Sequence, residues 1–488
     1  MSAETGKRRL DVIAALALEP VDAAWESTLK GSLPYRIWSS VLSLSTRVRV
    51  PLVEKAGRWL ETGAFLTVLV LLVATGLPQF ASDKEGLALF ALAALGLRVL
   101  AALVGCKETY RTNAMDMLVV AFLLLNVIAT AASHYPLASL KGLAKLVVYG
   151  AGYFAFASVL SAGRRRLVLA LSFAVATALA VAAYGLYQYK IGVAPLATWE
   201  DPTVEVKATR IYSTLGNPNL LAGYLLPLVP VAAVLGLAAA CRRKLIWLSV
   251  PALAAAGLLA IATVLTGSRG GYIGLFADAA ALAAVAGSWL WVSRPRLRPT
   301  VVFLVLALPL AVLAVIHAMP VFEHRLMSLF AGWEHSSNAF RLNVWRASWN
   351  MFLDNWWIGV GPGNQAFRLA YGLYMRSGFD ALGTYCVPLE IAVECGVIGL
   401  VIFGLLVGGV LARAHETFWT SGDAAVRWLA AGMAAAIAGM MAHGLVDTVF
   451  YRPQVQFLFW IMVAGLVALH QLEAHPPPQP ASAGSGKS

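Results

Sequence analysis

Long apolar runs alternate with short polar connections along most of the chain. A helix of about 20 apolar residues crosses the roughly 30 Å of hydrocarbon in a bilayer. The pattern therefore predicts an all-α polytopic membrane protein with about twelve transmembrane helices. The expected spans are residues 64–81, 86–105, 114–133, 143–162, 167–189, 219–240, 245–266, 270–292, 300–318, 386–412, 427–446 and 454–471.

Basic residues are concentrated in every second connection, as in Arg164–Arg166, Arg242–Lys244 and the arginines at 294, 296 and 298. Short cytoplasmic loops carry an excess of Lys and Arg, so these connections are expected to face the cytoplasm. Both termini then lie in the cytoplasm of a cell whose inner (plasma) membrane holds the protein.

The chain divides into three parts. Residues 1–63 are charged and partly amphipathic, which predicts a cytoplasmic segment at the membrane surface. Residues 64–471 form the transmembrane domain, and within it residues 320–384 form a large helical periplasmic loop between spans nine and ten. Residues 472–488 are rich in Pro, Ser and Gly and are expected to be disordered. Long structured connections often carry function, so the loop is the expected working site.

Composition excludes several classes of function. The chain is 59% hydrophobic and 13% charged, too little charge for a soluble protein of 488 residues. The net charge of +12 is explained by the basic loops, so no nucleic-acid partner is predicted. The four cysteines show neither metal-ligand spacing nor a disulfide framework, and no metal or cofactor is expected.

Polar residues come first at the outer end of span six, where Arg210 precedes a Gly-Asn-Pro-Asn motif. Asn217 or Asn219 is expected to cap that helix, with Pro218 at its start. An anion site at the helix N-terminus fits the motif equally well.

The second group is the hairpin at Ser268 and Arg269, between spans seven and eight. An arginine this close to hydrocarbon is costly unless it snorkels or has an anionic partner, and the adjacent glycines let a ligand approach. This pattern favours a functional arginine. Asp278, two turns further, is either its internal neighbour or a separate buried acid.

The third group lies in the long loop. Residues 338–352 have helical apolar spacing and tryptophans, which predicts an amphipathic helix on the membrane. Arg346 is expected to be solvated, whereas Arg341 is a candidate for the site. The turn at Gly359–Asn364 resembles a nucleotide-binding loop, but no strand precedes it, which excludes that function.

The fourth group lies where the loop returns to the membrane. Glu390 and Glu394 share one helix face, which fits either a proton or cation site or, as we prefer, pairing with the arginines. His443, Asp447 and Arg452 cluster at the outer end of span eleven. The simplest interpretation is an Asp447–Arg452 pair and a hydrogen-bonded core histidine.

The hairpin, the loop helix, the glycine turn and the Leu-Glu return resemble the O-antigen ligase and polymerase superfamily of membrane glycan-transfer enzymes. The resemblance implies that Arg269 and Arg341 bind a lipid-linked diphosphate sugar donor. The superfamily's histidine, which assists the acceptor hydroxyl, is replaced here by Tyr385. A phenol with a pKa near 10 is a poor base at neutral pH, so the catalytic residue is undetermined between Glu390 and Tyr385.

Several longer segments more closely resemble the IctB-like family of cyanobacterial bicarbonate transporters, which implies a role in inorganic carbon accumulation and allows a thylakoid location. These segments are RIYSTLGNPNLLAGYL, SSNAFRLNVW, GVGPGNQAF, TYCVPLEIAVECG and AHGLVDTVFYRP.

Two functions follow. The first is bicarbonate uptake, with the anion bound by Arg269, Arg341 and Arg210, because guanidinium groups suit planar oxyanions. The alternative is a ligase or polymerase acting on an undecaprenyl-diphosphate glycan, since diphosphates attract arginine equally well. Membrane lipid is a partner in both.

Overall fold

A computed structural model describes residues 19–33, 35–36, 39–40, 51–82, 85–104, 110–196, 209–300, 302–303 and 336–475. These residues form helices and connecting turns, with no strand among them. Within the described ranges, 11 helical segments are long and apolar enough to cross a membrane. They confirm the all-α polytopic fold. The predicted ninth span, 300–318, lies almost wholly outside the described residues.

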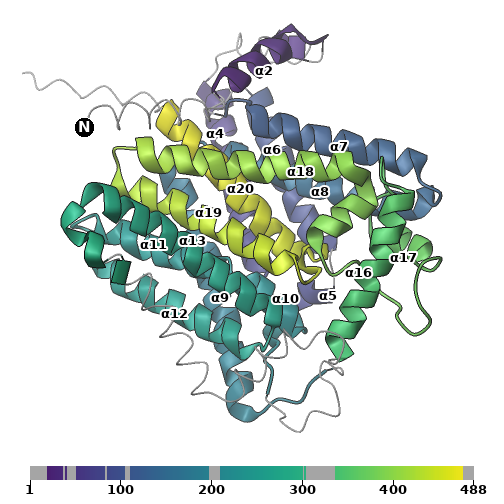
Figure 1. The fold of residues 1–488 in the computed structure, drawn as a ribbon. Coiled ribbons are helices and arrows are strands. Elements are labelled where there is room, and N and C mark those ends of the chain that lie inside the picture. The colour runs from purple at the N-terminus through teal and green to yellow at the C-terminus, as the bar shows by residue number, and fades with distance from the viewer. Residues whose placement is uncertain are drawn as a thin grey trace, which may run out of the picture.

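The helices run through the bundle in chain order (Figure 1). The first half comprises α2 (Glu19–Gly31), α4 (Pro51–Ala74), α5 (Gln79–Ser82), α6 (Glu85–Leu103), α7 (Ala114–Ala132), α8 (Pro136–Leu160), α9 (Arg164–Ile191), α10 (Pro218–Leu225), α11 (Leu228–Ala240), α12 (Ser249–Leu265) and α13 (Arg269–Ser293). The second half comprises α16 (Ser336–Asp354), α17 (Asn364–Tyr371), α18 (Val387–Thr420), α19 (Ala424–Gly444) and α20 (Pro453–Ala474). The first span thus begins at Pro51, earlier than the predicted residue 64.

Helix α20 is the centre of the bundle. Of its most apolar window, 94% is buried inside the protein, against 11% for α13. It packs against α8, α18 and α19, and its Phe457 contacts the rings of Tyr149 and Phe156. Because lipid tails are as apolar as leucine, such close packing, rather than escape from water, holds membrane helices together.

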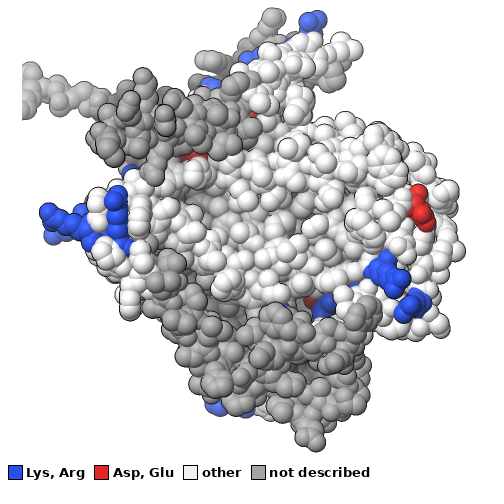
Figure 2. All heavy atoms as spheres, viewed as in Figure 1, with Lys and Arg blue, Asp and Glu red and all other residues white. Residues whose placement is uncertain are grey.

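Charged side chains are segregated to the ends of the bundle. On the visible face, Lys and Arg gather at the two ends and the surface between them carries almost none (Figure 2). The exposed Arg242–Lys244 group and Arg294, Arg296 and Arg298 lie at the opposite end from α16 and α17. An uncharged middle zone is what a hydrocarbon environment requires.

Helix α18 is broken at Gly396, whose φ of 69° and ψ of −170° are not helical. The turn at 359–363 fills the break, because Val360 and Gly361 donate to the carbonyls of Val393 and Glu394 at 2.9 and 3.0 Å. On the other strand of the break, the amide of Val397 donates to the carbonyl of Trp356 at 2.7 Å. Backbone groups freed by a broken helix must be satisfied inside the membrane, and this turn satisfies them.

Glycines let the turn approach so closely. A Cβ on Gly359 would lie 2.4 Å from the backbone of Glu394, and one on Gly363 would lie 2.6 Å from Gly142 of α8. Both glycines also have positive φ, at 81° and 101°. The glycine pattern seen in the sequence is therefore a packing requirement.

The loop helix α16 corrects one expectation. Its apolar face is not laid on the membrane surface, because Val344, Ala347 and Met351 are buried against Phe367 and Val393 of the protein itself. The exposed residues of the helix include Trp349 and Arg346. The prediction of a solvated Arg346 is confirmed.

The described part of the N-terminal segment docks on the bundle through one carboxylate. Asp22 of α2 accepts from Nη2 of Arg413 at 2.6 and 2.7 Å and from the backbone amide of Ala114 at 2.7 Å. The Arg413 side chain is only 1% exposed. Asp22 thus supplies the counter-charge for an arginine buried in α18.

Substituting Gly396 tests the break in α18. Gly396→Ala should destabilise the protein by at least about 1–3 kcal/mol, because a Cβ in this backbone conformation is strained and would also meet the carbonyl of Trp357. We expect a clear fall in the thermal unfolding midpoint in detergent. The matched control is Gly404→Ala on the same helix, where nothing lies within 4 Å. An equal midpoint for the two variants would show that the break does not depend on glycine.

Candidate functional site

Arg210 lies against the start of α10 and the end of α12. Its Nε donates to the carbonyl of Thr266 at 2.9 Å, and its Nη2 donates to Oδ1 of Asn219 at 3.2 Å. Asn217 caps α10 by accepting from the amides of Asn219 and Leu220 at 2.9 and 3.2 Å. The capping interpretation of Asn217 is confirmed, and Asn219 instead positions the arginine.

Arg269 connects the hairpin to the loop helix. Ser268 caps α13 by accepting from the amide of Gly271 at 3.2 Å, which places Arg269 in the first turn. The Nη1 of Arg269 donates to Oδ1 of Asn338 on α16 at 2.8 Å. The guanidinium therefore turns toward the loop, in agreement with the expectation that it does not simply snorkel.

Arg341 lies within one helical turn of Asn338, on the same helix. Its Nη2 is 3.7 Å from Oδ2 of Asp447, a separation of opposite charges that exceeds a hydrogen bond. Its Nε is buried and has no hydrogen-bond partner among the described residues. A buried donor left unpaired costs about 1–3 kcal/mol, so this guanidinium is incompletely satisfied by the protein.

Asp447 and Thr448 link Arg341 to Glu390. Oδ1 of Asp447 accepts from the amide of Thr448 at 2.8 Å, and the Thr448 hydroxyl donates to Oε2 of Glu390 at 2.7 Å. The preferred expectation that the two glutamates pair with arginines is not what the structure shows. Asp447 is the carboxylate beside Arg341, and Thr448 relays the contact to Glu390.

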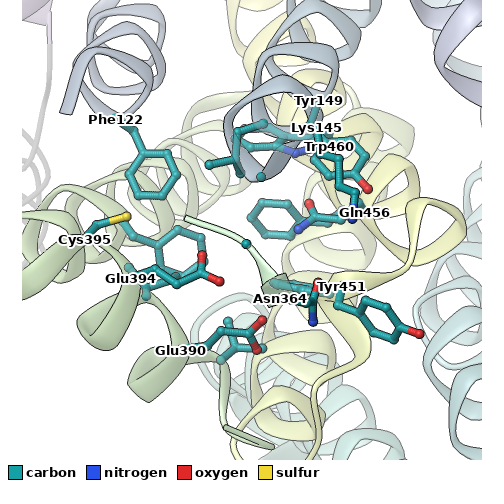
Figure 3. Close-up of a pocket in the computed structure, with 18 residues that line it drawn as sticks. Phe122, Lys145, Tyr149, Asn364, Glu390, Glu394, Cys395, Tyr451, Gln456 and Trp460 are labelled. Atoms are coloured by element: carbon teal, nitrogen blue, oxygen red, sulfur yellow. The ribbon is translucent and has the colours of Figure 1, made fainter. Parts of the chain in front are cut away.

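Glu390 and Glu394 line a cavity of about 110 Å³ between α7, α8, α18 and α20. Figure 3 shows both carboxyl groups turned to the same space, with Lys145 and Gln456 on its far side. Aromatic rings make up much of the remaining wall, including Tyr149, Phe450 and Trp460. The cavity thus combines an apolar wall with a few charged groups.

Tyr385, which occupies the position of the superfamily histidine, lies beside the arginines in a strained conformation. Its φ is 56°, unusual for a residue other than glycine, and its ring packs edge-on against Phe340 with centroids 5.6 Å apart. Burial raises the pKa of Tyr385 above its ordinary value, and the negative charge of Asp447 raises it further, although Arg341 opposes this. A phenol with a raised pKa is protonated at neutral pH and cannot act as a base there.

The remaining candidates are placed apart. His443 is fully buried against Gly270 and Gly274 of α13, and neither ring nitrogen has a hydrogen-bond partner among the described residues, so it is a core histidine without the expected hydrogen bond. Arg452 lies over the ring of Tyr451 at 4.8 Å, while the charge beside Asp447 is Arg341 rather than the expected Arg452. Asp278 is buried against Gly439 of α19.

Comparison with known families decides the class of this site. Residues 228–404 match the family model described as O-antigen ligase. The chain carries an O-antigen ligase domain. The match spans Arg269, Arg341 and Glu390, and it supports the superfamily resemblance while lending none to the IctB-like family or to bicarbonate transport. No curated protein matches the chain.

Sequence reasoning missed three residues of this region: Asn338, Thr448 and Lys145. Asn338 and Thr448 are neutral and act only through a partner far along the chain, which no local pattern reveals. Lys145 interrupts the apolar run of α8, so its unusual position within a span was the available signal.

The raised pKa of Tyr385 can be measured directly. The difference in tyrosinate absorbance between wild type and Tyr385→Phe should show no ionisation of this phenol below about pH 10, the ordinary tyrosine value. The phenylalanine keeps the contact with Phe340 and serves as the folded reference. Ionisation of Tyr385 near pH 7 would reverse the assignment and restore it as a candidate base.

Proposed function

We propose that the protein transfers a glycan from an undecaprenyl-diphosphate donor to an acceptor hydroxyl at the outer face of the inner membrane. Two findings support this proposal: the O-antigen ligase match over the region of the site, and the gathering of arginines at one end of the bundle. The basic loops at the opposite end favour a cytoplasmic location for that end, which puts the arginines outside.

The donor's diphosphate binds between Arg269 and Arg341. Guanidinium groups bind phosphate oxygens in pairs of parallel charge-assisted hydrogen bonds. Arg269 is positioned through Asn338, within one turn of Arg341 on α16, so both arginines border the same part of the loop helix. The observation that carries the proposal is the buried Nε of Arg341, a donor that the described residues leave unpaired. Arg210, held by Asn219 and Thr266, flanks this group.

Glu390 is the proposed base. The acceptor oxygen attacks the anomeric carbon of the donor sugar, and its proton passes to the Glu390 carboxylate. The bond between that carbon and the diphosphate oxygen breaks, and the electron pair leaves with the diphosphate. Arg269 and Arg341 stabilise the charge that develops on it. The Thr448 hydroxyl holds Glu390 in place by donating to Oε2.

Donor binding tests the roles of the arginines. Arg269→Ala and Arg341→Ala should each weaken the binding of undecaprenyl diphosphate to the protein in nanodiscs by at least about tenfold, since a charge-assisted hydrogen bond contributes about 1.5–3 kcal/mol. Arg346→Ala, an exposed arginine on the same helix, is the matched control and should bind as wild type. Equal affinities for all three variants would contradict the site.

A transfer assay tests the reaction and its base. Purified protein in proteoliposomes, given a labelled undecaprenyl-diphosphate oligosaccharide and a glycan extract from the source cells, should move label onto the acceptor. Glu390→Gln should lower the rate about 10²–10⁴-fold with donor binding intact, because general-base catalysis contributes that much. Asp380→Asn, at an exposed pair with Arg368, is the control. A wild-type protein that transfers no glycan but accumulates labelled bicarbonate would overturn the proposal in favour of transport.

A further inference from the structure

The cavity beside Glu390 holds charged groups that the proposed reaction does not yet use. Glu394 follows Glu390 by one helical turn, and both side chains line the same space. Lys145 of α8 lines it too and is exposed at the protein surface, so it lies where the cavity meets that surface. Ionisable groups inside membrane spans are costly, and those that occur commonly form proton or ion pathways.

The size of the cavity limits what it holds. An engineered cavity of about 150 Å³ takes one benzene molecule, whereas this one measures about 110 Å³. A sugar ring is larger than benzene and does not fit. A single water needs about 10–15 Å³ on this measure together with several polar partners, so the space and its polar lining suit a small group of waters.

The break in α18 fixes the carboxyl pair relative to the donor site. Gly361 donates to the backbone carbonyl of Glu394, and Val360 donates to that of Val393. Ser133 in turn donates to the carbonyl of Val360 at 2.6 Å, which ties the turn to the end of α7. Glu390 is held separately by Thr448. Both acids are therefore anchored, and Glu390 contacts the arginine group at one side and the cavity at the other.

We propose that Glu394 and Lys145 form a proton relay behind Glu390. This inference rests on the proposed function, in which Glu390 takes the proton of the acceptor hydroxyl. The proton then passes from Glu390 through cavity water to Glu394, which returns Glu390 to its carboxylate form for the next turnover. Glu394 releases the proton to solvent at the surface end, and the ammonium of Lys145 stabilises the carboxylate that remains.

The other groups around the pair do not replace this route. Tyr149 of α8, Tyr451 beside the start of α20 and Cys395 of α18 also line the cavity, and Asp447 lies behind Thr448. The Sγ of Cys395 is directed to Oδ1 of Asn126 at 3.0 Å. Lys145 is the only basic side chain among the residues that line this cavity.

The pH profile of transfer tests the relay. Glu394→Gln and Lys145→Met should lower kcat and change its dependence on pH, with KM for the donor and the binding of undecaprenyl diphosphate unchanged. Glu394→Asp should restore part of kcat. Gln456→Met alters the same cavity without removing an ionisable group, so its pH profile should keep the wild-type shape. A wild-type profile in Glu394→Gln would overturn the relay.

A second measurement does not depend on transfer. Difference infrared spectroscopy of the protonated carboxyl band should show that Glu390→Gln moves the titration of Glu394, and that Glu394→Gln moves that of Glu390. Independent titrations would refute the pair. Coupled titrations in a protein without glycan transfer would uphold the proton exchange between the two acids and reject the proposed reaction.

Discussion

The satisfaction of backbone groups at the break in α18 is the constraint on which the rest of the site depends. A helix interrupted inside a membrane leaves amides and carbonyls that water cannot reach. Here the turn at 359–363 donates to Val393 and Glu394, and Trp356 accepts from Val397. The same contacts fix the turn that carries Glu390 and Glu394, so one set of hydrogen bonds supports both the fold and the acidic pair.

The arginines are held by a different part of the chain. Arg269 belongs to the hairpin before α13 and Arg341 to the loop helix, and the bond from Arg269 to Asn338 brings them together. Burial of Val344 and Met351 seats α16 on the protein, so the loop helix has a defined position relative to α18. Donor recognition and proton removal are thus assigned to two supports that meet at Asp447 and Thr448.

The fold was predictable because hydrocarbon imposes a length and an apolar composition on every span, and both are visible locally in the sequence. The caps at Asn217 and the functional character of Arg269 followed for the same local reason. The pairing of charges did not. Asp447 was assigned to Arg452, its near neighbour in sequence, whereas it lies beside Arg341 on a distant helix. The surface placement of α16 was also wrong, because a helical apolar stripe indicates burial without saying whether lipid or protein covers it.

The ion pair between Asp22 and Arg413 has a consequence for any shortened form of the chain. Arg413 lies in the same long helix that carries Glu390 near its other end, and its guanidinium is almost wholly buried. Removing one partner of a buried pair typically costs about 3–5 kcal/mol, since the other charge stays uncompensated. Trimming the amino terminus past Asp22 to aid crystallisation would therefore weaken the helix at the centre of the protein, even though the excised residues lie outside the spans.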